Sequence, residues 1–151
     1  MKIILGSDHG GYYLKEEIKK YLEKKKIDFE DLGPHKYDKK DDYSDYTIPV
    51  AIKVSKNPNY KGIILGFSGQ GELIAANKVP GIRAALYYGG NKKIIKLSKE
   101  HNNSNVLSLA GGFLSKKEAI DAIDLWLKTP FSNHPRHLRR LKKISNYEEK
   151  R

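Results

Sequence analysis

The stretch that decides the fold spans residues 62–78 and reads GIILGFSGQGELIAANK. Residues 62–65 form a short apolar run of the kind found in buried strands, and residues 71–78 have a helical pattern. The glycine-rich segment GFSGQGE, residues 66–72, connects the two. A strand, a glycine loop and a helix in this order predict one unit of an α/β domain with a parallel sheet.

Short apolar runs alternate with helical patterns along most of the chain. The predicted strands cover residues 3–6, 27–32, 62–65, 82–87 and 105–109. The predicted helices cover residues 11–25, 45–56, 71–78, 91–100 and 115–128. After Thr129-Pro130, which should end the preceding helix, residues 136–144 are expected to form a basic helix outside this alternation. We therefore expect a single domain over residues 1–151, with a basic helical extension at about 130–151.

The composition is that of an ordinary globular domain. Of 151 residues, 38% are hydrophobic and 31% are charged, and the apolar runs are far shorter than the ~20 residues of a membrane-spanning helix. The apolar run after Met1 and Lys2 is too short for a signal peptide, so we expect a cytoplasmic protein with no membrane partner. Because the chain has no cysteine, disulfides, cysteine-ligated metals and a cysteine nucleophile are excluded.

The formal charge of +11 raises the question of a nucleic-acid partner, because basic surfaces bind phosphate backbones. The lysines, however, are spread over stretches such as 15–26 and 92–99, where they are mixed with glutamate or apolar residues. That distribution is typical of solvated helix faces rather than of a basic patch. We therefore expect no nucleic-acid partner as the main function.

The glycine loop differs from the two common nucleotide-binding loops. A P-loop continues with Lys and then Ser or Thr, whereas this chain has Glu72 and Leu73, and the full G-x-G-x-x-G of dinucleotide folds is also missing. Backbone N–H groups from Ser68 to Gly71 are suited to stabilising an oxyanion, and Glu72 to moving a proton beside it. From the residues alone, a second interpretation stays open, in which Glu72 only caps the helix.

Asp8 and His9 follow the first predicted strand, and therefore lie at the same carboxyl edge as the glycine loop. An adjacent carboxylate and imidazole can handle substrate hydroxyls or phosphate, although Asp8 is also a typical helix N-cap. The polar segment 33–45 is long enough for a functional loop, with a plain connection as the alternative.

Further polar residues lie late in the chain. His101 ends the fourth predicted helix, where a charged histidine is stabilising by itself, so taken singly it indicates a structural role. Arg136 and Arg140 are one helical turn apart and can grip one phosphate, unless they belong to a solvated or partner-binding face. No histidine or carboxylate spacing matches a zinc or calcium motif, so a metal is not required.

Taken together, six segments resemble the type B ribose-5-phosphate isomerases and their galactose-6-phosphate isomerase relatives, nearly end to end. They are GSDHGG at 6–11, Asp42-Tyr43, Gly69-x-Gly71 with IAANK at 74–78, GIRA at 81–84, EHNN at 100–103, and RHLRR at 136–140. The resemblance implies a Rossmann-like three-layer α/β/α sandwich with a five-stranded parallel sheet and an extra C-terminal helix. It also implies a dimer or a dimer of dimers with active sites shared between subunits.

The implied activity is aldose–ketose isomerisation of ribose 5-phosphate and ribulose 5-phosphate through a cis-enediolate, with no metal or other cofactor. Many members of the family place the catalytic base on a cysteine where this chain has Gly66. Another branch lacks that cysteine and uses a glutamate after the second loop glycine, which matches Glu72.

The resemblance also implies a role for each matching residue. The catalytic residues would be the base Glu72, His101 in ring opening, Asp8 at the ring oxygen or hydroxyls, and Ser68 through its backbone amide. The substrate-binding residues would hold the enediolate oxygen, orient the sugar or bind its phosphate, and they are Gly69, Gly71, Tyr43, Asn102, His9, Arg136 and Arg140.

One position departs from the family pattern. Relatives usually carry a phosphate-binding arginine after the fifth strand, where this chain has Gly112 in the sequence AGGFL. Losing such a contact costs roughly 1.5–3 kcal/mol unless a neighbouring cation replaces it. Two alternatives therefore stay open: an isomerase of a six-carbon substrate such as galactose 6-phosphate or allose 6-phosphate, and a non-catalytic sugar-phosphate-binding protein.

Overall fold

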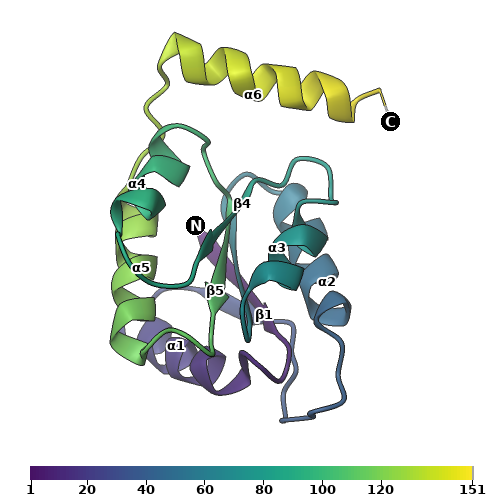
Figure 1. Cartoon of the computed structure of the whole chain (residues 1–151), viewed down its shortest axis with the longest axis vertical. Coiled ribbons are helices and arrows are strands. Elements are labelled where there is room, and N and C mark those ends of the chain that lie inside the picture. Colours follow the sequence, from purple (N-terminus) through teal and green to yellow (C-terminus); the bar gives the residue numbers. More distant parts are fainter. Residues whose placement is uncertain (151) are drawn as a thin grey trace.

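The computed structural model describes residues 1–150, which form a five-stranded sheet with strand order β2-β1-β3-β5-β4 (Figure 1). Every neighbouring pair of strands is parallel. The strands are β1 (Lys2–Ser7), β2 (Phe29–Asp31), β3 (Tyr60–Gly66), β4 (Ala84–Tyr87) and β5 (Val106–Ala110). Since Ser7 pairs with Leu65 and Gly66 with Ala110, the carboxyl ends of the three central strands lie level and the loops after them meet.

Helices cover both faces of the sheet. The helices are α1 (Tyr12–Lys24), α2 (Tyr43–Ser55), α3 (Gln70–Ala76), α4 (Lys93–Glu100), α5 (Lys116–Lys128) and α6 (Pro135–Glu148). In Figure 1, α1, α4 and α5 lie on one side of the sheet and α2 and α3 on the other. The predicted three-layer α/β/α sandwich with a parallel sheet and an extra C-terminal helix is therefore confirmed, and each predicted element is present with shifts of a few residues at its ends.

The central strands are buried on both faces, which explains their continuous apolar runs. In β1, Ile3 and Leu5 belong to the core cluster beneath α1 and α5, whereas Ile4 belongs to the cluster beneath α2. Successive side chains of a strand point to opposite faces, so one run of three apolar residues serves two separate cores. Trp126 of α5 is the largest fully buried side chain.

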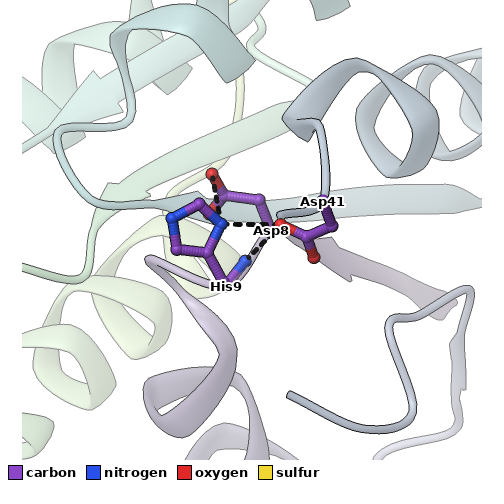
Figure 2. A group of neighbouring side chains, drawn as sticks. All are labelled: Asp8, His9 and Asp41. Atoms are coloured by element: carbon purple, nitrogen blue, oxygen red, sulfur yellow. Dashed lines mark hydrogen bonds and ion pairs between the residues drawn. The ribbon is translucent and has the colours of Figure 1, made fainter. Parts of the chain in front are cut away.

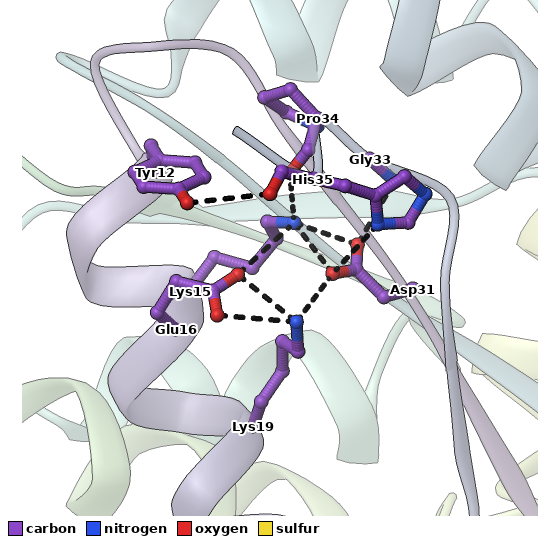
Figure 3. Close-up of polar contacts among 8 residues, drawn as sticks. All are labelled: Tyr12, Lys15, Glu16, Lys19, Asp31, Gly33, Pro34 and His35. Atoms are coloured by element: carbon purple, nitrogen blue, oxygen red, sulfur yellow. Dashed lines mark hydrogen bonds and ion pairs between the residues drawn. The ribbon is translucent and has the colours of Figure 1, made fainter. Parts of the chain in front are cut away.

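Two lysines correct the expectation that all lysines in these helices are solvated. Lys15 of α1 is fully buried, and its Nζ donates to both carboxylate oxygens of Asp31 at 2.7 Å and to the carbonyl of Pro34 at 2.8 Å (Figure 3). Lys99 of α4 is 7% exposed and lies over the ring of Trp126. Sequence periodicity placed both among exposed lysines, because only the fold brings Asp31 and Trp126 next to them.

The extra helix α6 lies beyond the amino ends of the strands (Figure 1). It begins after Thr129-Pro130, which ends α5 at Lys128 as expected. Contacts that hold this region include the Ser132 N–H, which donates to the Glu100 carbonyl, and the Gly81 N–H, which donates to Glu148 Oε2 at 3.0 Å. None of the residues of α6 is buried. Within residues 1–150, the helices are too short or too polar to cross a membrane.

Candidate active site

The loops after β1, β3 and β5 meet at the carboxyl edge of the sheet. The Asp8 N–H donates to the Leu65 carbonyl at 3.2 Å, and the Gly111 N–H donates to the Gly66 carbonyl at 2.7 Å. These bonds tie both neighbouring loops to the end of β3. The three loops therefore form one surface, with the glycine loop at its centre.

Glu72 lies in the first turn of α3 and is buried, with only 3% of its surface exposed. Its carboxylate lies over the Cα of Gly66, where a Cβ would overlap the carboxylate atoms. Burial raises the pKa of this carboxyl above its ordinary value, the negative charge of Asp8 adds to the rise, and His9 opposes it. A carboxylate that is desolvated in this way is a stronger base than one in water, as proton abstraction from carbon requires.

This geometry explains how a glutamate can stand in for a side chain at position 66. A side chain on Gly66 and the carboxylate of Glu72 compete for the same volume, so the carboxylate would have to move if position 66 carried a side chain. The carboxylate therefore reaches the place that a side chain on the last residue of β3 would occupy. The N-cap of α3 is Gly69, which has no side chain, and the Glu72 carboxylate both lies over Gly66 and accepts a hydrogen bond from its own backbone N–H in the first turn.

The glycine loop has a fixed shape. Gly69 has a φ of 73°, a left-handed conformation that glycine adopts without strain, and a Cβ there would lie 2.8 Å from Leu86 Cδ1. The hydroxyl of Ser108 in β5 donates to the Gly69 carbonyl at 2.7 Å, and the Gln70 N–H donates to Ser68 Oγ at 3.3 Å. These two hydrogen bonds fix the backbone of the loop, so its conformation is set before a ligand binds.

Tyr43 approaches the same loop from α2. A Cβ at Gly71 would lie 2.8 Å from both Cε1 and Cζ of the tyrosine, so the ring packs directly on the loop. Tyr43 is the first residue of α2 and is 41% exposed. The predicted sugar-orienting tyrosine is thus brought to the glycine loop with an exposed edge.

Sequence reasoning missed Asp41, which pairs with His9 (Figure 2). The Asp41 Oδ1 atom accepts from His9 Nδ1 at 2.7 Å and from the His9 backbone N–H at 3.0 Å, although 32 residues separate the two. This hydrogen bond raises the pKa of the His9 imidazole, and the charges of Asp8 and Asp41 reinforce the rise. The segment 33–45 is therefore not only a connection between β2 and α2, because it also supplies the hydrogen-bond partner of His9. Its acidic residues were the only available signal, and the sequence did not say which of them reaches His9.

Asp8 organises the turn before α1 but is not the helix N-cap that the sequence offered as an alternative, since the N-cap is Gly11 and no side chain caps this helix. Its Oδ1 accepts the N–H of Gly10 at 2.8 Å and of Gly11 at 3.2 Å, which organises the turn before α1. Its Oδ2 lies 3.9 Å from His9 Nδ1. Burial raises the pKa of Asp8, while His9 and the Gly10 N–H lower it, and the rise prevails. Asp8 therefore stabilises this turn and also lies beside His9 at the carboxyl edge of the sheet.

Asp8, His9 and Asp41 each offer one ligand atom, and these atoms lie within 4.8 Å of one another. The geometry nevertheless fits a hydrogen-bonded pair better than a metal centre. If Asp41 is ionised, its oxygen can only accept, so the 2.7 Å contact places a proton on His9 Nδ1, and this nitrogen is then not a metal ligand.

The remaining predicted site residues lie at the other end of the sheet. His101 follows α4 and therefore precedes β5, and α6 with Arg136 and Arg140 lies at the same amino edge (Figure 1). The rings of His101 and His137 are 4.2 Å apart, which places α6 against the end of α4. Within one chain, the structure does not bring His101, Asn102, Arg136 and Arg140 together with Glu72.

The turn that carries His101 and Asn102 is itself well anchored. Arg83 Nε donates to the Asn103 carbonyl at 2.9 Å, and Asn103 has a left-handed φ of 47°. The Arg83 N–H donates to Asn105 Oδ1 at 2.8 Å, which closes the other side of the turn. His101 and Asn102 themselves are exposed, so a fixed turn presents both side chains to solvent.

The fold and the carboxyl edge define an α/β protein with a candidate site made of a buried carboxylate, a fixed glycine loop and an Asp–His pair. The family model described as Ribose/Galactose Isomerase matches residues 3–144. The chain belongs to this family.

Relatives and solved structures agree with that assignment. The chain is 40% identical over 148 residues to ribose-5-phosphate isomerase B of Mycolicibacterium paratuberculosis, which covers 98% of this chain and 92% of the relative. It is also similar to the crystal structure of ribose-5-phosphate isomerase B from Mycoplasma genitalium with bound ribulose-5-phosphate. The TM-score is 0.93 at 40% identity, with 99% and 97% of the two chains covered. The enzyme from Clostridium thermocellum gives a TM-score of 0.90 at 41% identity, over 99% of each chain.

Proposed function

We propose that this protein is a metal-free aldose–ketose isomerase that interconverts ribose 5-phosphate and ribulose 5-phosphate, with Glu72 as the base. The observation that carries the proposal is the buried Glu72 carboxylate, which lies over Gly66 beside the glycine loop. The Mycoplasma genitalium relative with bound ribulose-5-phosphate supports this substrate, as do the relatives named ribose-5-phosphate isomerase B.

In the proposed reaction, Glu72 removes the proton from C2 of the open-chain aldose, and the electron pair of that bond forms the C1–C2 double bond of a cis-enediolate. The same carboxyl then returns the proton to C1, while a second proton moves between O1 and O2. The raised pKa of Glu72 suits both steps, because the group must accept and then release a proton near neutral pH. Backbone amides at Ser68, Gly69 and Gly71 would stabilise the charge on the enediolate oxygen.

The groups around Glu72 are assigned to binding and ring opening. Asp8 would act on the ring oxygen or hydroxyls, and Tyr43, packed on Gly71, would orient the sugar. His9 would bind the phosphate, since its pairing with Asp41 favours the charged imidazolium.

We further propose that a complete site forms between two copies of the chain, in a dimer or a dimer of dimers. In one chain His101, Asn102, Arg136 and Arg140 lie at the opposite edge of the sheet from Glu72. The α6 helix leaves Leu138 and Ile144 nearly half exposed. An apolar stripe with arginines on a helix that buries none of its own residues is suited to packing on a second copy, where the arginines would reach the phosphate.

The test is the initial rate of ribulose 5-phosphate formation from ribose 5-phosphate, measured with a metal chelator present and over a wide substrate range. Turnover with a millimolar or lower Michaelis constant is the expected result, and it would also show that the missing arginine at Gly112 is compensated. An absence of turnover on ribose 5-phosphate would overturn the proposal. Galactose 6-phosphate and allose 6-phosphate, assayed in parallel, separate a six-carbon isomerase from a protein that only binds sugar phosphates.

A further inference from the structure

The exposed ring of Phe67 occupies the place of the missing side chain at Gly112. A Cβ on Gly112 would overlap this ring, lying 2.7 Å from its Cζ atom, and the Gly112 N–H donates to the Phe67 carbonyl at 2.9 Å. The ring of Phe113 meets Phe67 edge to face, with 5.5 Å between centroids. Position 112 therefore cannot carry a side chain while Phe67 keeps this conformation.

Phe67 is not a core residue, since 63% of its surface is exposed, and 62% of Phe113 is exposed as well. Phe113 lines a pocket of about 150 Å³ together with Ser68, Gln70 and Tyr88. On the other side, a Cβ at Gly10, next to His9, would lie 2.6 Å from the backbone nitrogen of Phe67. Phe67 thus stands between the loop that carries His9 and the loop after β5.

We propose that Phe67 and Gly112 are a coupled pair that determines how this site holds a phosphate monoester. The ring of Phe67 occupies the space in which a cationic side chain at position 112 would lie. The loop after β5 therefore presents an apolar surface to the phosphate and no positively charged side chain. The inference rests on the proposed function, because it takes the ligand of this edge to be a sugar phosphate. An aromatic face carries partial negative charge, so this surface turns the phosphate toward His9 and leaves the carbon-bound hydrogens of the sugar to face the ring.

The experiment compares the unaltered chain with three variants, Phe67→Ala, Gly112→Arg and the double variant. The dissociation constant of inorganic phosphate is measured for each by calorimetry. We expect the double variant to bind phosphate about tenfold or more tighter than Phe67→Ala, because the space is open and a charge-assisted contact is gained. Gly112→Arg alone should gain little, since its stem collides with the ring. Phe67→Ala/Gly112→Gln, with similar reach and no charge, is the matched control and should show no gain.

Two results would overturn the inference. If Gly112→Arg alone gains as much affinity as the double variant, the ring does not exclude a side chain at 112. If the double variant gains nothing over the glutamine control, this corner does not face the phosphate. If Gly112→Arg fails to fold, recovery of the melting temperature in the double variant supports the same coupling.

The phosphate measurement is independent of catalysis, so the two proposals can fail separately. If the unaltered chain isomerises no sugar phosphate while the double variant gains phosphate affinity, the isomerase proposal fails and the coupled pair stands. If the chain is active, the double variant should lower the Michaelis constant for ribose 5-phosphate and leave kcat nearly unchanged. That split is expected when a contact is made equally in the bound substrate and in the transition state.

Discussion

The carboxyl edge and the amino edge of the sheet both carry charged side chains, but these are buried at the first edge and exposed at the second. At the carboxyl edge Glu72 and Asp8 are buried with raised pKa values, and His9 is hydrogen-bonded to a buried carboxylate. At the amino edge Arg136 and Arg140 are exposed on a helix that buries none of its residues. The first edge is organised within one chain, whereas the helix that carries Arg136 and Arg140 at the second edge leaves all of its residues unburied within one chain.

Two glutamates show that position in a helix does not decide this difference. Glu72 and Glu118 both lie in the first turn of a helix. Burial raises the pKa of Glu72, whereas the backbone N–H and hydroxyl of Ser115 lower the pKa of the exposed Glu118. The same side chain is a carboxyl with a raised pKa in one place and part of a helix cap in the other, because only one of the two is removed from water.

The largest expected effect distinguishes these two glutamates. Glu72→Gln should lower kcat for ribose 5-phosphate by about 10²- to 10⁴-fold, since the amide cannot accept the proton. Inorganic phosphate should still bind nearly as tightly. Glu118→Gln is the matched control and should keep its turnover. Turnover that survives in Glu72→Gln would remove this residue as the base, whatever the control shows.

The next prediction joins the two edges. Glu72→Gln and the double variant Arg136→Ala/Arg140→Ala should each be nearly inactive alone. When the two chains are refolded together, about a quarter of the original turnover should return, because half of the dimers are mixed and half of the sites in each are intact. Each kind of chain refolded by itself is the control. If the mixture stays inactive although mixed dimers form, the two edges do not share a site.

A stability prediction concerns the carboxyl edge alone. Lys15→Met should destabilise the fold by about 1.5–3 kcal/mol, because the buried carboxylate of Asp31 loses the two hydrogen bonds from Lys15 and keeps only Lys19 as a cationic partner. The melting temperature should fall by roughly 3–10 °C. Lys20→Met is the control, because Lys20 pairs with Glu17 on an exposed surface and its loss should shift the melting temperature little.

The pH dependence of this effect has a definite sign. Burial opposes the ionised form of Asp31, but Lys15 and Lys19 outweigh burial, so its pKa lies below the ordinary value of 3.8. The ionised carboxylate therefore stabilises the fold above about pH 4, and this contribution is lost as the pH falls through the lower pKa of the folded state. The gap between Lys15→Met and the unaltered chain should shrink over the same range. A gap that is constant down to pH 2 would contradict an ionic origin.

The smallest expected effect compares one histidine from each edge. His9 should titrate above 6.5 because of its hydrogen bond to Asp41. His137 should titrate below 6.5, because of burial first and then the nearby His101 and other cations. Titration of the imidazole proton signals by NMR measures both values. Asp41→Asn should lower the value for His9 and leave that for His137 unchanged, and a reversed order would contradict the contrast between the edges.

The sequence predicted most of the fold and about half of the arrangement of the candidate site. The strand, glycine loop and helix of residues 62–78 appear as predicted, because each depends on local pattern and backbone chemistry. Asp8, His9 and Glu72 were placed together because loops after parallel strands must meet at one edge. Asp41 was not singled out, since nothing in segment 33–45 indicates which acidic side chain reaches His9.

The sequence by itself determined the alternation of elements, the sheet edge on which the glycine loop lies and the class of chemistry. Periodicity, turn residues and the order of the elements along the chain are sufficient for the first two, whereas the class of chemistry came from the resemblance of six segments to a known family. Only the tertiary structure decided that Glu72 fills the space over Gly66, that Phe67 fills the space at Gly112, and that Lys15 is buried with Asp31. In the first two contacts one side chain fills the volume that a side chain on a glycine would need, and in the third a lysine and an aspartate form a buried ion pair. Residues that are not neighbours in the sequence make such contacts only once the chain is packed.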